Sequence, residues 1–194
     1  MTDYERVLEE SGDRVFQSFD PSICGYKALH NLASVFQTLG RHHDAVERWE
    51  QALEIQPGFR PAWLGLFRSR IDLGELDSAK EKLKSLPVEV DDATRALAAA
   101  IVAEAEGDWN TAHHTLEAAW EMTGDCECLD EACRILMHAG QLDRAIPSLQ
   151  KLDSARPQNA AVLHNLGAAL HAKGDSKTAI PYLEASSQLR PDGP

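Results

Sequence analysis

The chain has 194 residues, of which 43% are hydrophobic, and a formal net charge of −12. This acidic balance, without any Lys/Arg-rich run, argues against nucleic-acid and anionic-membrane partners. No apolar stretch reaches the roughly 18 to 20 residues that span a bilayer. Four cysteines do not make a disulfide framework, and no basic-then-apolar leader opens the sequence, so we expect a cytoplasmic protein with reduced thiols. The missing leader carries no weight if the sequence is a fragment of a larger protein.

Residues 1–25 stand apart from the rest of the chain. Their apolar residues suggest one or two helical turns that pack on the first repeat of the chain: Tyr4, Val7, Leu8, Val15, Phe16 and Phe19. The stretch from Asp20 to Ser22 contains a proline and predicts a break before residue 26.

From about residue 26 the sequence repeats with a period of 33 or 34 residues. Glycines mark the period at Gly40, Gly74, Gly107, Gly140 and Gly174. Five residues later stands an alanine each time, at Ala45, Ala79, Ala112, Ala145 and Ala179. Apolar residues at helical spacing precede each glycine, so each period predicts two helices joined at a left-handed glycine. The small alanine lets the second helix cross close to the first.

Two periods depart from this pattern, and two prolines need an explanation. The second period has Phe67 where a small residue is usual, and Pro87 shortens its second helix. The third places small residues where larger ones are usual: Ala96, Ala99, Ala100 and Ala103. We expect irregular packing in both. Pro147 and Pro181 are expected near the first turn of a second helix, where a missing N–H costs little.

The repeat resembles the tetratricopeptide repeat (TPR) family. The resemblance covers about residues 26–194 as five units: 26–59, 60–92, 93–125, 126–159 and 160–194. It implies an all-α fold, a right-handed α-solenoid of about five helix-turn-helix repeats. It also implies a scaffold that binds a peptide or protein partner in a concave groove lined by the first helices.

The resemblance further implies which residues face that groove. They are Lys27, His30, Asn31, Ser34, Arg68, Arg134, His138, His164, Asn165 and His171. Asn31 and Asn165 occupy the position whose amide often holds the ligand backbone in this family. The middle units have Gly65, Ala98 and Glu131 there, so no continuous asparagine row exists. Lys27, Asn31 and Arg68 are only fragments of the family's clamp for a C-terminal carboxylate, and we do not expect that mode of recognition.

Acidic residues dominate the middle of the chain. No Lys or Arg occurs between Arg95 and Arg134, while acids stand at Glu104, Glu106, Asp108, Glu117, Glu121, Asp125, Glu127, Asp130 and Glu131. Such a field of one sign could steer a basic partner, or it could simply aid solubility. Both interpretations stay open at this point.

Catalytic and metal-binding patterns are not found in the sequence. It has no phosphate-binding glycine loop, nucleophile elbow or zinc-protease motif, so we expect no enzyme activity in this chain and no cofactor. Cys126, Cys128, Cys133 and His138 match no common zinc spacing, and Cys133 falls at a small packing position. The pairs His42-His43 and His113-His114 are expected to be solvated beside turns, and adjacent helical residues should point apart, so no metal site is predicted.

Two hypotheses for function remain. The first is a stand-alone scaffold for a protein or peptide. The second is a non-catalytic region of, or accessory to, a bacterial glycosyltransferase, because the run from Phe19 to Trp49 resembles the TPR segment beside some family-2 transferase domains. Ile180, Leu183 and Leu189 also predict an uncovered apolar face on the last helix, for self-association or a neighbouring domain.

Overall fold

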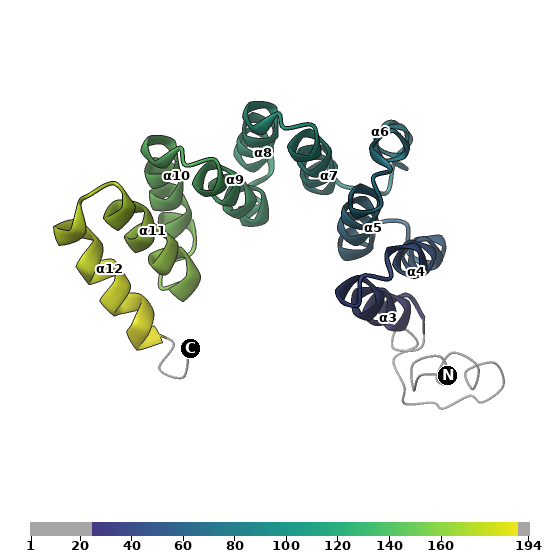
Figure 1. Cartoon of the computed structure of the whole chain (residues 1–194), viewed down its shortest axis with the longest axis horizontal. Coiled ribbons are helices and arrows are strands. Elements are labelled where there is room, and N and C mark those ends of the chain that lie inside the picture. The colour runs from purple at the N-terminus through teal and green to yellow at the C-terminus, as the bar shows by residue number, and fades with distance from the viewer. Residues whose placement is uncertain (1–24, 190–194) are drawn as a thin grey trace. The chain divides into compact units, whose positions relative to one another are not determined.

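The computed structural model describes residues 25–189, which form ten α-helices and no strand. The predicted all-α fold is therefore confirmed for the described chain. The expected helical turns before residue 25 lie outside the described residues. In chain order the helices are α3 (Tyr26–Thr38), α4 (His42–Ile55), α5 (Arg60–Asp72), α6 (Leu76–Lys84), α7 (Asp92–Ala105), α8 (Trp109–Thr123), α9 (Cys126–His138), α10 (Leu142–Ala155), α11 (Ala160–Ala172) and α12 (Ser176–Leu189) (Figure 1).

A glycine with positive φ joins the two helices of each pair, as predicted. Gly40 has a φ of 71° after α3, where its N–H donates to the Gln37 carbonyl at 3.0 Å and the next N–H donates to the Phe36 carbonyl at 2.9 Å. These bonds satisfy carbonyls that the helix end would otherwise leave unpaired. The other repeat glycines also have positive φ: Gly74, Gly107, Gly140 and Gly174.

The helices pack into two compact units, one ending at Ala105 and the other beginning at Glu106. In unit 1, α3 packs on α4, α4 on α5, and α5 on both α6 and α7. In unit 2, α8 packs on α9, and each later helix packs on the one before it. None of the described helices combines the length and apolar composition that a bilayer crossing requires.

The core of unit 1 contains the predicted irregularity of the second period. Phe67 is fully buried, and α6 has only 9 residues, because the chain leaves the helix before Pro87. The connection after α6 is held by Arg95, whose guanidinium donates to the carbonyls of Pro87 at 2.5 Å and of Val90 at 3.1 Å. A charged side chain thus supplies the donors that the missing helical turn would have supplied.

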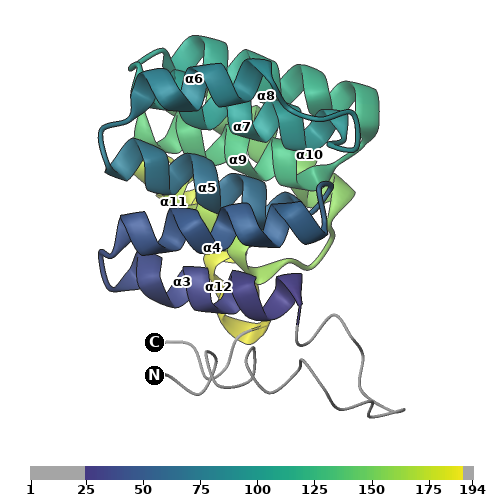
Figure 2. The ribbon, with the colours of Figure 1, turned by 90° about the vertical axis from the view of Figure 1, so that its right-hand side faces the viewer.

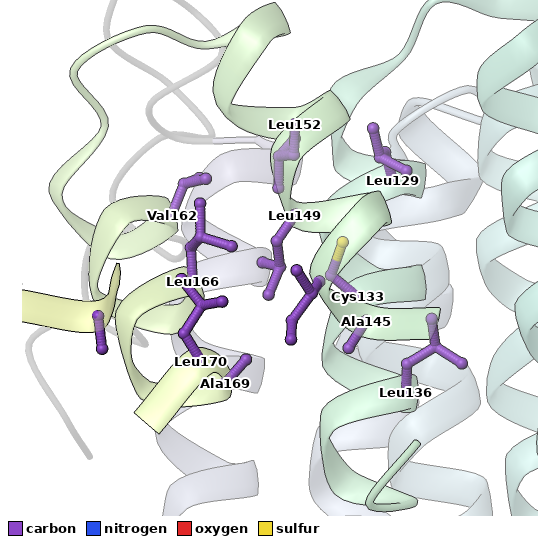
Figure 3. Close-up of a cluster of buried hydrophobic side chains, with 12 residues drawn as sticks. Leu129, Cys133, Leu136, Ala145, Leu149, Leu152, Val162, Leu166, Ala169 and Leu170 are labelled. Carbon is purple, nitrogen blue, oxygen red and sulfur yellow. The ribbon is translucent and has the colours of Figure 1, made fainter. Parts of the chain in front are cut away.

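The core of unit 2 is a cluster of aliphatic side chains between α9, α10 and α11 (Figure 3). Leu149 and Leu166 are fully buried at its centre. Cys133 lies among them with 1% of its surface exposed, as predicted for a small packing residue. Burying each large aliphatic side chain contributes about 1.5 to 3 kcal/mol, so this cluster is the main source of stability in unit 2.

The two prolines lie deeper in their helices than predicted. Pro147 is the sixth residue of α10, and Pro181 is the sixth residue of α12. An N–H at either position would have donated to the carbonyl four residues earlier, so each helix forgoes one internal bond. The prediction that the missing N–H would have little or no partner to lose was therefore wrong, although both helices continue through the proline for two more turns.

Candidate functional site

The predicted groove residues of unit 1 lie mainly on α3. Lys27 and Asn31 are exposed, one helical turn apart. Ser34 is half-buried, and its hydroxyl donates to the carbonyl of His30 at 3.0 Å, within its own helix. Of these three side chains, Lys27 and Asn31 therefore present polar groups outward. Arg68 of α5 is exposed as well.

His30 packs against aromatic rings. Its ring is half-buried, 5.1 Å from the Trp49 ring and 5.3 Å from the Phe59 ring, measured between centroids. Its Nδ1 is buried without a hydrogen-bond partner in the described structure. This burial lowers the pKa of His30, because water no longer solvates the charged ring. The structure thus gives this residue a role in joining α3, α4 and the connection after α4.

Arg70 of α5 forms hydrogen bonds and ion pairs with residues that the sequence pattern did not connect to it. Only 15% of its side chain is exposed, and its guanidinium donates to Glu50 at 2.7 Å and also to the Ser78 hydroxyl. Glu75 lies 3.8 Å away. The three partners come from α4, the turn before α6 and α6 itself, so Arg70 ties three segments of unit 1 together.

In unit 2 the predicted groove residues of α9 have partners within the chain. The Arg134 guanidinium donates both to one Glu131 oxygen at 2.9 Å and to the other at 3.0 Å. The exposed His138 ring stacks on the Trp109 ring with centroids 5.4 Å apart. Any ligand that used either residue would compete with these contacts.

On α11 the predicted residues differ in exposure. His164 is exposed and Asn165 is half-buried. His171 is near the turn into α12, where its Nδ1 lies 2.9 Å from the Ser176 hydroxyl. A partner that used His171 would compete with its contact to Ser176.

The predicted acidic residues do not act as one group. Glu104 belongs to α7 in unit 1, and the others belong to unit 2. Asp108 caps α8, and its hydrogen bonds from the Thr111 hydroxyl and N–H hold its pKa below the usual range. Glu117 pairs with Lys151 at 3.2 Å. Burial raises the pKa of Asp130, which lies on α9 with Glu127 and Glu131.

The predicted environment of His113 was wrong. We expected solvated histidines beside the turns, and His43 and His114 are indeed exposed, while His42 is half-buried 3.4 Å from Asp72. His113, however, has only 3% of its surface exposed, and Arg144 of α10 lies 3.0 Å from its ring. Desolvation lowers the pKa of His113, and the nearby Arg144 charge acts in the same direction against the opposing effect of Glu117.

The prediction that adjacent histidines point apart was also wrong for this pair. The rings of His113 and His114 lie 5.2 Å apart at 73°. Together with Glu117 they bring three possible metal-ligand atoms within 4.8 Å of one another. Within residues 25–189 no other group of three such side chains is so close.

The partners of this group do not suit a cation. Arg144 lies 3.0 Å from Nδ1 of His113, and because a guanidinium can only donate, that nitrogen must accept. The neutral ring then carries its proton on Nε2, the atom that faces Glu117 at 3.8 Å. A metal ion would need that nitrogen deprotonated and would lie close to Arg144 and Lys151, which already pair with this cluster. The arrangement fits a polar contact between α8 and α10.

The cysteines of α9 show the character of packing residues. Cys128 and Cys133 are buried, and Cys126 is half-buried. Burial raises the pKa of the Cys133 thiol to about 12, with Asp130 and Glu117 adding to the effect. Such a thiol carries almost no thiolate at neutral pH and is therefore a poor nucleophile.

The predicted apolar face on the last helix is only partly exposed. Ile180 and Leu189 are exposed, at 53% and 43%. Leu183 instead packs over Gly167, where a Cβ would lie only 2.7 Å from it. The small residue on α11 thus accommodates one of the three side chains that were expected to face outward.

Comparison with known proteins gives a curated relative that is larger than this chain. The chain is 28% identical over 185 residues to the tetratricopeptide repeat and J domain-containing co-chaperone DNJ1 of Fusarium oxysporum f. sp. lycopersici. The match covers 89% of this chain and 35% of that protein. The chain therefore spans about a third of the length of the curated relative it matches.

Solved structures share the fold at low sequence identity. A thermophilic TPR protein of Thermus thermophilus superimposes with a TM-score of 0.63 at 18% identity, covering 87% of this chain and 93% of that one. A TPR protein of Parabacteroides merdae gives 0.62 at 16% identity, covering 96% and 69%. YrrB, described as a TPR protein with an unusual peptide-binding site, gives 0.53 at 17% identity, covering 98% and 94%.

The family itself follows from the sequence profile. The tetratricopeptide repeat profile matches residues 38–104 and 136–194, which together are more than half of the chain. With the repeat glycines at positive φ and the helix pairs that they join, the chain belongs to the tetratricopeptide repeat family.

Proposed function

We propose that this chain is a non-catalytic scaffold that binds a peptide or protein through the exposed faces of its first helices. In unit 1 the contact residues would be Lys27 and Asn31 of α3 with Arg68 of α5. In unit 2 they would be His164 and Asn165 of α11, with Arg134 of α9. Polar side chains on a packed helical frame suit recognition of an extended backbone and its charged groups.

The proposal rests on the side-chain amides of two asparagines that occupy the same position in their repeats. Asn31 and Asn165 each lie nine residues before their repeat glycine. Within residues 25–189 neither side-chain amide forms a hydrogen bond, whereas Asn159 and Asn110 use theirs for a helix cap and for Arg144. A side-chain amide can donate to a peptide carbonyl and accept from a peptide N–H at once. These two groups therefore have the right chemistry for a polypeptide ligand.

The relatives support a partner of this class. The name of the Fusarium relative makes that protein a co-chaperone, and YrrB is described as having a peptide-binding site.

A direct test begins with a peptide selected from a random display library against the intact chain. Its affinity is then measured for the wild type and for Asn31→Ala/Asn165→Ala. The matched control is Gln56→Ala/Gln150→Ala, which removes two exposed amides away from the first helices. We expect the asparagine variant to lose about tenfold or more, since an unpaired buried polar group on the ligand costs about 1 to 3 kcal/mol. Equal affinities for the two double variants would remove the site assignment.

A second candidate is a role beside a family-2 glycosyltransferase, and it rests on the run from Phe19 to Trp49. Residues 26–49 of that run form α3 and the first half of α4, the helix pair that carries Asn31. The chain would then bind an acceptor protein while another domain transfers the sugar. Sugar transfer by this chain alone would contradict both candidates.

A further inference from the structure

Exposed large apolar side chains recur where the second helices end. Within residues 25–189 there are seven such side chains, and four of them share this position: Ile55, Val88, Met122 and Leu189. Ile55, Met122 and Leu189 each follow their repeat glycine by 15 residues, and Val88 follows Gly74 by 14. A periodic recurrence of this kind points to a property of the surface, because isolated exposed apolar residues would be scattered.

Val88 shows most clearly that packing does not explain this exposure. Its neighbours Leu86 and Val90 point into unit 1 and are 9% and 2% exposed. Val88 lies between them and is 90% exposed. Unit 1 closes its core with the two flanking residues, so the fold does not need an apolar side chain at position 88.

An exposed acid stands next to three of these apolar residues. Glu54 precedes Ile55, Glu89 follows Val88, and Glu121 precedes Met122. All three carboxylates are exposed, and in the described part of the chain none of them forms an ion pair or hydrogen bond. The same combination of an apolar side chain and an unpaired negative charge thus occurs in both units.

In unit 1 two of these combinations lie on adjacent connections. A Cβ on Gly58, after α4, would lie 3.0 Å from the Glu89 carbonyl, after α6. Arg60 also reaches Asp91 at 3.1 Å and the Thr94 hydroxyl at 2.8 Å. Figure 2 shows both connections at the same edge of unit 1.

We propose that Glu54, Ile55, Val88 and Glu89 form a second contact surface, the helix-end surface. Its partner is a cationic polypeptide segment in which Lys or Arg flanks a large apolar side chain. The apolar pair provides area to bury, and the two carboxylates complement the flanking charges. An anionic bilayer would meet these carboxylates with repulsion, and a second copy of a chain with a net charge of −12 would do the same.

This surface is separate from the one in the proposed function. Ile55 ends α4 and Val88 follows α6, whereas the groove residues lie on α3 and α5. Binding here can therefore fail while binding through Asn31 persists, and the reverse also holds.

The test uses the full chain and a fluorescent 14-residue helical peptide of leucine and lysine, followed by anisotropy at about 0.15 M salt. We expect Ile55→Ser/Val88→Ser to weaken binding by about tenfold. The matched variant Val35→Ser/Leu39→Ser removes two exposed apolar residues from α3 and its C-cap and should change affinity by less than about twofold. A lysine-serine peptide without leucine should bind at least about tenfold more weakly.

The contribution of the two carboxylates to binding is tested with a second pair of double variants. Glu54→Gln/Glu89→Gln should weaken binding and flatten its salt dependence, whereas Glu47→Gln/Glu81→Gln, also exposed in unit 1, should do neither. This pair carries the test if the serine variants do not fold. Equal effects of the two glutamine pairs would mean that net charge alone attracts the peptide and would overturn the proposal. Loss of binding in Val35→Ser/Leu39→Ser, without loss in Ile55→Ser/Val88→Ser, would overturn it too.

Discussion

The indole ring of Trp49 fills the space that a side chain at Gly65 would need. A Cβ built on Gly65 of α5 would lie 2.4 Å from two ring carbons of Trp49 on α4. Trp49 is 2% exposed, and its ring nitrogen donates to the Ser69 hydroxyl of α5 at 3.4 Å. The ring is therefore held by this hydrogen bond as well as by its packing against Gly65. The spacing of α4 and α5 in unit 1 depends on this pair.

Gly65→Ala should therefore destabilise the chain. An alanine in a helix interior normally gains about 1 kcal/mol over glycine, but overpacking against a fixed ring costs about 1 to 3 kcal/mol or more. Gly167→Ala is the matched change in unit 2, where the added Cβ would lie 2.7 Å from the half-buried, rotatable Leu183 and 3.2 Å from the Ala179 carbonyl oxygen. Urea unfolding followed by circular dichroism should rank Gly65→Ala as the more destabilised of the two. Equal midpoints would show that the indole ring can move aside.

The buried His113 predicts a pH dependence of stability. The pKa of His113 is lowered in the folded chain, so the unfolded chain binds the proton more tightly. Its contribution is fully present above the unfolded value of about 6.5 and is lost as the pH falls toward the lower folded value. Protonation would also place a charged ring against Arg144, 3.0 Å away.

The measurement is the free energy of unfolding between pH 5 and pH 8. His113→Gln should flatten the loss of stability on the acid side, because glutamine does not titrate. His30 keeps part of the dependence, since burial lowers the pKa of His30 in the same direction. His43→Gln, at an exposed position of α4, is the control and should leave the wild-type slope unchanged. Parallel curves for His113→Gln and wild type would contradict the burial argument.

Periodicity explains what the sequence predicted well. The glycines, the alanines five residues later and the apolar spacing all report positions within one repeat, and they located the helix pairs. His113, Arg70 and Arg95 depend instead on partners in other helices or connections, between 5 and 31 residues away. A repeat pattern carries no information on such pairs. The exposure of Val88 could have been suspected only from its place between Leu86 and Val90 after a shortened helix.

Arg95 donates hydrogen bonds to the connection after α6, so loss of its guanidinium should destabilise this connection more than the rest of unit 1. Arg95→Met keeps the apolar stem but removes a donor from the Val90 carbonyl and leaves the Pro87 carbonyl with only the Val90 N–H at 3.1 Å, which costs about 1 to 3 kcal/mol. Hydrogen exchange should accelerate first at the amides of residues 86 and 88–92. Arg68→Met, an exposed change on α5, should leave these amides unaffected. Uniform acceleration across α3 to α7 would show instead that the connection and the core of unit 1 open together.

The thiol of Cys133 should be inert while the chain is folded. Its pKa of about 12 leaves almost no thiolate at pH 8, and its surface is 1% exposed. Peptide mapping after brief iodoacetamide treatment should find Cys126, the half-buried neighbour, modified well before Cys133. In urea the two should react at similar rates. Equal rates in the folded chain would contradict the packing of α9.

The central claim, that polypeptides bind on the first helices, is tested most directly by site-specific photo-crosslinking. Benzoylphenylalanine replaces one exposed residue at a time, at Asn31 of α3 or His164 of α11, and at Glu47 of α4 or Gln150 of α10 as controls. After irradiation with the library-selected peptide, we expect crosslinks from position 31 or 164 and none from 47 or 150. Crosslinks confined to positions 47 and 150 would place the ligand on the second helices and contradict the account.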